Sequence, residues 1–129
     1  MGQLLPGTAI TYNGEEMNME NTWISWEDTV DPQGCQAGID DYERFSRDPE
    51  RTPLQWSAES MAGFTDGTET WLPINENYVT LNLEAQKVAA KSPYKVYKKL
   101  TDARKMVAAQ TGELRVKAVG DDTLVFVRY

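Results

Sequence analysis

The 129-residue chain contains no histidine, and this absence removes several classes of enzyme. Ser-His-Asp and Cys-His triads use an imidazole as their base, and many zinc sites use histidine as a ligand. The single cysteine, Cys35, has no partner within the chain, so no internal disulfide framework exists. Cys35 is therefore either an ordinary unpaired thiol or one half of a bridge to a cysteine outside this chain.

Long apolar runs are also absent from the sequence. No stretch approaches the roughly eighteen apolar residues that a membrane-spanning helix needs. The first residues, Met-Gly-Gln-Leu-Leu-Pro, lack both the basic start and the apolar centre of a signal peptide. We therefore expect no membrane span here, and a membrane anchor only outside these residues.

The net charge of −7 is distributed unevenly along the chain. Residues 1–82 carry fifteen acidic and three basic side chains (−12), whereas residues 83–129 carry five acidic and ten basic ones (+5). An acidic segment repels a nucleic-acid backbone, and the lysines of the second segment recur at the spacing of a solvated helix face. The sequence therefore predicts no nucleic-acid partner.

The first two thirds of the chain combine one short strand with long loops. Residues 8–12 are β-prone and weakly polar, which favours a strand buried on both faces. Residues 18–82 hold all four tryptophans and four of the six prolines, without sustained periodicity. A loop region of this length in a compact protein is usually functional.

The last third is more regular. A short helix is expected over residues 83–90. Ser92 and Pro93 then suit the N-cap and first position of an amphipathic helix that ends before Thr111. The residues expected on its buried face recur at spacings of 3, 3 and 4: Tyr97, Leu100, Ala103 and Val107.

A β-hairpin is expected at the C-terminal end. Apolar and basic residues alternate from 114 to 118, Gly120 opens a turn, and a β-prone run covers 123–128. The order of strand, long loop, helix and hairpin is typical of the last βα unit of a barrel that continues into a separate β domain. We place these parts at residues 1–110 and 111–129.

Three charged residues are candidates for a functional site. Glu15 and Glu16 directly follow the predicted strand, at the edge where a βα barrel has its active site. The alternatives are that both are solvated loop acids, or that one of them pairs with an arginine. Arg47 lies in a loop stiffened by Pro49 and Pro53, where its guanidinium either forks onto a carboxylate or sugar hydroxyls, or simply holds the loop. Tryptophans and acids gathered in loops are typical of a sugar-binding site, because aromatic rings stack on the apolar faces of sugars while polar side chains bind the hydroxyls. The alternative is that the tryptophans only hold a long loop in place.

Several motifs in order resemble the α-amylase superfamily. Pro-Gly-Thr-Ala-Ile-Thr-Tyr-Asn-Gly-Glu-Glu-Met-Asn-Met (6–19) resembles its eighth barrel strand, in the form found in α-glucosidases and oligo-1,6-glucosidases. Ser-Arg-Asp-Pro-Glu-Arg-Thr-Pro-Leu-Gln-Trp (46–56) and Trp-Leu-Pro-Ile-Asn (71–75) follow in the same order. Trp-Ile-Ser-Trp-Glu-Asp-Thr-Val-Asp-Pro-Gln-Gly-Cys (23–35) is similar to the insect maltases in particular. Two positions depart from the pattern: Ala9 replaces a proline and Asn18 replaces a glycine.

The resemblance implies a C-terminal fragment of a retaining exo-α-glucosidase. Such an enzyme releases terminal α-linked glucose from maltose, sucrose or short oligosaccharides with two carboxylates. In the family those groups and a third aspartate lie on earlier strands, so we expect no catalytic residue in this chain and no activity from it alone. No cofactor or metal is implied, and the family places the protein outside the cell or at its surface.

The resemblance also assigns roles to individual residues. Arg47 matches an arginine that lines the pocket beside the sugar beyond the cleaved bond, with an acid of the preceding loop as its partner. We expect that acid to be Glu27, and expect Glu15 and Glu16 to support the site. A second class shares the barrel and these motifs: the non-catalytic heavy subunits of heteromeric amino-acid transporters. The loop at 23–35 favours the maltase.

Overall fold

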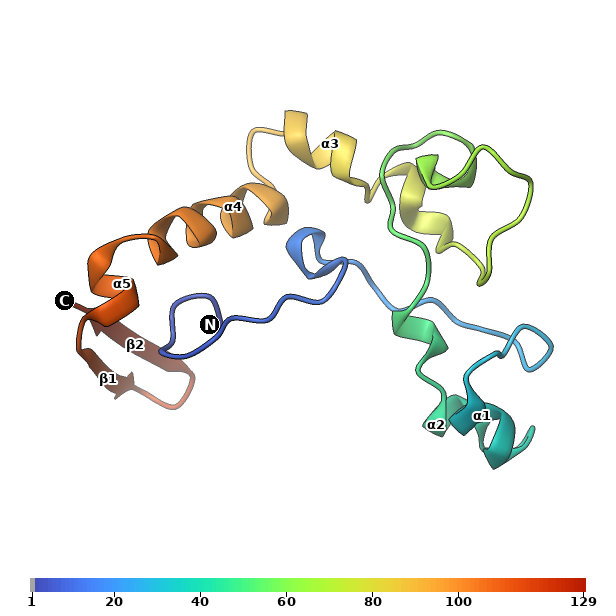
Figure 1. Cartoon of the computed structure of the whole chain (residues 1–129), viewed down its shortest axis with the longest axis horizontal. Coiled ribbons are helices and arrows are strands. Elements are labelled where there is room, and N and C mark those ends of the chain that lie inside the picture. Colours follow the sequence, from blue (N-terminus) through green and yellow to red (C-terminus); the bar gives the residue numbers. More distant parts are fainter. Residues whose placement is uncertain (1) are drawn as a thin grey trace.

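The computed structural model describes residues 2–129. Figure 1 shows helices α3 (Leu83–Val88), α4 (Pro93–Arg104) and α5 (Val107–Thr111) following one another, with the N-terminal segment alongside α4. A hairpin of β1 (Leu114–Val119) and β2 (Thr123–Arg128) lies at one end of this row. At the other end lie the long loops, with α1 (Pro32–Ala37) packed against α2 (Tyr42–Phe45).

Helix α4 begins as its sequence predicts. Ser92 is the N-cap, and its hydroxyl accepts a hydrogen bond from the Lys95 amide at 3.2 Å, while Pro93 occupies the first turn. The helix does not continue to residue 110, because Met106 adopts an extended backbone and α5 starts anew at Val107. Val107 is 76% exposed, so its predicted place on the buried face is wrong: the break rotates it away from the face of α4.

The strand predicted at residues 8–12 is not formed. No other strand lies beside it in the described part of the chain, and a strand needs a neighbour to complete its backbone hydrogen bonds. Ile10, expected to be buried, is 86% exposed. Side chains hold the segment instead: the hydroxyls of Thr11 and Tyr97 lie 2.7 Å apart.

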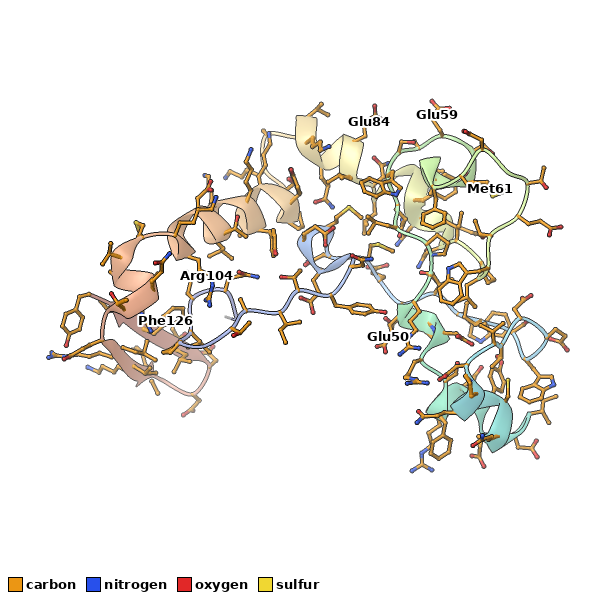
Figure 2. All side chains as sticks on the ribbon, in the orientation of Figure 1. Glu50, Glu59, Met61, Glu84, Arg104 and Phe126 are labelled. Carbon is orange, nitrogen blue, oxygen red and sulfur yellow. The ribbon has the colours of Figure 1, made fainter. Side chains whose placement is uncertain are left out.

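Arg104 makes the second attachment of the N-terminal segment. Its guanidinium donates to the carbonyl oxygens of Gln3, Leu5 and Gly7. Figure 2 shows this side chain reaching from the end of α4 to the segment. One cation thus satisfies carbonyl groups that a neighbouring strand would otherwise pair.

A tight turn follows the N-terminal segment and contains the 3-10 helix η1 (Glu15–Met17). Gly14 and Asn18 flank it in the left-handed region, with φ of 95° and 57°. Asparagine tolerates this region better than most side chains, so the replacement of glycine at 18 preserves the turn. Met17 is fully buried, and its carbonyl accepts a hydrogen bond from the Gln86 side chain of α3 at 2.8 Å.

Residues 18–82 form ordered loops, as predicted, interrupted by short helical turns. Besides α1 and α2 these are η2 (Asp48–Glu50), η3 (Ser60–Gly63) and η4 (Glu76–Val79). The amide of Gln55, a fully buried residue, donates to the Asn77 side chain and to the Leu81 carbonyl, both at 2.8 Å. Buried Ile24, Tyr42, Ala62 and Leu72 provide the apolar contacts beneath the loops.

The hairpin is confirmed, with Leu114 paired to Arg128 and Val119 to Thr123 in antiparallel register. Gly120 supplies the left-handed residue of its turn at φ 67°. Arg128 donates to the carbonyls of Ala108 and Ala109, which attaches the hairpin to α5. The domain boundary between residues 110 and 111 stays a prediction.

Candidate functional site

Arg47 and Asp31 form the best-defined charged pair of the described residues. Asp31 is the N-cap of α1 and Arg47 precedes η2, so two loops sixteen residues apart meet here. Asp31 Oδ2 accepts from the amide of Arg47 at 2.8 Å and from its Nε at 3.0 Å, while Oδ1 accepts from Nη2. The Asp31 side chain is fully buried and the Arg47 side chain is 41% exposed.

This pairing shifts the pKa of both groups. The hydrogen bonds from the Arg47 side chain hold the pKa of Asp31 well below its usual range, although burial acts in the opposite direction. The same hydrogen bonds raise the pKa of Arg47 above its ordinary value. Both groups are therefore charged throughout the physiological pH range.

A second buried aspartate completes the connection between the two loops. Asp48 is 1% exposed, and its Oδ2 accepts from the backbone amides of Val30 and Asp31, each at 2.8 Å. The Asp31 carboxylate thus binds Arg47 on the second loop, and the Asp48 carboxylate of that loop binds the backbone of residues 30 and 31 on the first. We call this arrangement of Asp31, Arg47 and Asp48 the reciprocal clasp.

Glu27 is not the partner of Arg47. The prediction was wrong because Asp31, four residues further on, is carried into the buried corner by the start of α1. Glu27 instead lines a cavity of about 560 Å³ together with Asp28, Met61 and Trp71. Carboxylates beside an exposed indole are groups that sugars contact in binding sites, so the place of Glu27 is compatible with substrate binding.

The wall of this cavity contains unusual backbone. Met61 and its neighbour Ala62 have φ of 53° and 52°, in the left-handed region that non-glycine residues rarely adopt. The Ala62 carbonyl accepts from the amides of Trp56 and Ser57, at 2.9 and 3.0 Å, which holds this conformation. Figure 2 shows Met61 on the loop at the end of the molecule opposite the hairpin.

Glu15 and Glu16 lie in η1, away from Arg47. The carboxylate of Glu16 accepts from the amide of Gly14 at 2.9 Å and so caps the turn. Glu15 lines a cavity of about 500 Å³ between the N-terminal segment and α4. In Figure 1 the turn of η1 lies beside the start of α4, whereas α1 and α2 lie among the long loops at the end of the molecule away from the hairpin. The structure therefore does not bring Glu15 and Glu16 together with Arg47.

The tryptophans divide between structural and exposed positions. Trp26 and Tyr42 pack in a T-shaped arrangement, with ring centroids 5.5 Å apart. Trp23 is 70% exposed, and its indole N–H donates to Glu43 at 2.9 Å. Trp56 and Trp71 keep about half of their surfaces open, so three of the four rings have faces on which a sugar can stack.

Cys35 is a free, exposed thiol, whose Sγ lies 3.6 Å from the Thr29 carbonyl. Among residues 2–129 no three acidic or cysteine side chains converge in a way that could hold a metal ion. No helix in the described part of the chain combines the length and hydropathy required to cross a membrane.

Sequence reasoning missed Asp31 and Asp48. Each precedes a proline, a pairing that is typical of turns and gives no indication of a buried acid. The available signal was charge balance: three arginines stand among fifteen acids in residues 1–82, so a buried acid beside an arginine was to be expected.

Comparison with known proteins gives a consistent result. The Alpha-amylase family model, described as "Alpha amylase, catalytic domain", matches residues 1–112. Maltase A1 of Drosophila melanogaster is 48% identical over 98% of this chain and 22% of its own length. A salivary alpha-glucosidase of Aedes aegypti is 45% identical, again over 98% of this chain and 22% of its own. The chain thus spans about a fifth of the length of these curated relatives.

A solved structure and a more distant relative extend the comparison. The crystal structure of Bacillus licheniformis trehalose-6-phosphate hydrolase superposes on 98% of this chain and 26% of its own, with a TM-score of 0.81 and 32% identity. The human amino acid transporter heavy chain SLC3A1 is 35% identical over 75% of this chain and 12% of its own length.

Proposed function

Because this chain belongs to the alpha-amylase family, we propose that it forms part of a retaining exo-α-glucosidase of the insect maltase type. The enzyme would hydrolyse terminal α-linked glucose from maltose, sucrose or short oligosaccharides. The observation that carries this proposal is the identity to proteins named maltase and alpha-glucosidase, which extends over almost all of the chain. Its oligosaccharide substrate is neutral, and the family chemistry needs two carboxylates and no cofactor.

Within that enzyme, the chain is proposed to be the C-terminal portion of the (β/α)8 barrel followed by the start of an antiparallel β domain. The exposed surface supports this. It amounts to 9146 Å², whereas a compact protein of 14.6 kDa exposes about 6,900 Å². The excess of about 2,200 Å² includes large apolar side chains such as Ile10 and Val88. A barrel would cover these residues and provide neighbouring strands for residues 8–12.

The residues of this chain would bind and orient the sugar, while carboxylates elsewhere in the enzyme perform the displacement. Arg47 presents a guanidinium in a fixed position for sugar hydroxyls, and Glu27 offers a carboxylate in the cavity beside Trp71. Glu16 stabilises the turn after the N-terminal segment, and Glu15 stands beside it. Both are proposed to support the site rather than to react.

We also propose that the enzyme acts outside the cell or at its surface. The support is a relative whose name describes it as salivary. The alternative function, a heavy-subunit ectodomain of an amino-acid transporter, has weaker support, because the transporter relative is less similar and matches less of the chain.

The test is release of glucose from maltose, measured side by side for this chain and for the longer protein encoded by its gene. We expect activity from the longer protein only. Folded but inactive longer protein would favour the transporter subunit, whereas activity in the isolated 129 residues would refute the assignment of the catalytic carboxylates to another part of the enzyme.

A further inference from the structure

The reciprocal clasp leaves one side of the Arg47 guanidinium free. Nε and Nη2 both bind the Asp31 carboxylate, whereas Nη1 makes no hydrogen bond within residues 2–129. A guanidinium has five N–H donors, so about three remain for another partner. Since 41% of the side chain is exposed, these donors are accessible.

The position of Asp31 is itself fixed from several directions. Its backbone amide donates to Asp48, its carbonyl accepts from the Cys35 amide at 2.9 Å, and the following Pro32 restricts the backbone of Asp31 to an extended conformation. The carboxylate therefore has little freedom, and neither does the guanidinium that it binds. A planar fork held in this manner loses less conformational entropy on binding than a free arginine.

The charge around Arg47 is more than neutralised. Asp31 binds it directly, and Asp48 and Glu50 are close enough to raise its pKa further by electrostatic attraction. Three carboxylates thus stabilise the charge of one cation electrostatically. The available N–H groups can donate to a hydroxyl oxygen, but the local field opposes a ligand that brings further negative charge.

We propose that Asp31 is a specificity-determining, positioning residue, which makes Arg47 select neutral sugars and reject sugar phosphates. Asp31 does so by binding one edge of the guanidinium and compensating its charge. This inference rests on the proposed function, in which Arg47 contacts the oligosaccharide. Without Asp31, Arg47 would be a mobile cation with its full affinity for phosphate.

The experiment uses the longer enzyme and compares inhibition of maltose hydrolysis by glucose and by glucose 6-phosphate. In Asp31→Asn, the positive charge of Arg47 is no longer neutralised by Asp31, so its guanidinium can form charge-assisted hydrogen bonds to a phosphate. We therefore expect the ratio of the two inhibition constants to move about tenfold in favour of glucose 6-phosphate. The KM for maltose should rise more than kcat falls. The control is Asp40→Asn, which removes the same charge from an exposed position and should leave the ratio unchanged.

Two further variants separate positioning from a structural role. Combining Asp31→Asn with Arg47→Ala should abolish the gain in phosphate binding, since the gain requires the cation. Arg47→Lys keeps a charge beside Asp31 but loses the fork, so KM for maltose should rise while phosphate stays excluded. If Asp31→Asn does not fold, inhibition of Arg47→Lys by glucose and by glucose 6-phosphate is measured in its place.

The outcomes are distinguishable. An unchanged inhibition ratio in folded Asp31→Asn, an equal shift in Asp40→Asn, or a shift that survives in the double variant would overturn the inference while leaving the α-glucosidase assignment intact. If Asp31→Asn cannot be folded, phosphate inhibition in Arg47→Lys as strong as that by glucose would overturn it as well. A wild-type longer protein that releases no glucose would remove the proposed function, and this inference with it.

Discussion

Gln86 connects three elements through one side chain, and its replacement is a stringent test of the packing. The residue is 9% exposed. Its Nε2 donates to the Met17 carbonyl of η1 at 2.8 Å, and its Oε1 accepts from the Tyr94 amide at the start of α4 at 3.0 Å. Gln86→Met keeps a side chain of similar volume but removes both hydrogen bonds, leaving a buried carbonyl and a partly buried amide without partners.

The expected cost follows from those two groups. Each buried hydrogen bond lost with its partner left in place costs about 1–2 kcal/mol, so Gln86→Met should lower the free energy of unfolding by about 2–4 kcal/mol. The assay is urea unfolding followed by circular dichroism, together with hydrogen exchange of the Tyr94 amide. That amide should exchange at least about tenfold faster in the variant, since about 1.4 kcal/mol corresponds to a factor of ten.

The matched control is Gln36→Ala on α1. Gln36 is exposed, and its side chain makes no hydrogen bond within the described residues, so the change should stay within about 0.5 kcal/mol. A loss for Gln86→Met no larger than this control would refute the idea that Gln86 holds η1, α3 and α4 together.

Three further predictions follow from other contacts. Ser92→Ala removes the side-chain cap of the Lys95 amide and should reduce stability by about 1 kcal/mol, measured by thermal unfolding against wild type. Gly14→Ala places a Cβ 2.8 Å from Met19 Sδ at φ 95°, and a loss of about 1–3 kcal/mol in the same assay is expected. The lowered pKa of Asp31 means that its charge stabilises the fold above its unfolded pKa of about 3.9, and that this stabilisation is lost as pH falls below that value. The difference in unfolding free energy between wild type and Asp31→Asn should therefore be constant from about pH 8 to 5 and shrink below about pH 4; a difference that grows in acid would contradict the assigned charge.

Local signals in the sequence predicted the parts of the fold that depend on neighbouring residues. The cap at Ser92 and the alternation around Gly120 act within a few residues, and both α4 and the hairpin formed where expected. The end of α4 was missed because Met106 and Val107 carry no breaker signal.

Contacts between distant residues were harder to predict. Residues 8–12 have the composition of a strand, but a strand also needs a partner, and composition contains no information on which partner is present. The resemblance identified Arg47 but not its acid. Glu27 and Asp31 lie in the same acidic loop, and only the path of the chain into α1 decides which of them reaches the guanidinium.

The grip of Arg104 on the N-terminal segment has a consequence for the order in which the chain folds. Its contacts to Gln3, Leu5 and Gly7 span 101, 99 and 97 residues, and the Thr11–Tyr97 contact spans 86. During synthesis residues 3–11 leave the ribosome well before Tyr97 and Arg104, the residues of α4 that bind them. Because closing such long loops is slow, the contacts between residues 3–11 and α4 should form only after α4 itself has formed. A pause in translation before Tyr97 would delay these contacts further.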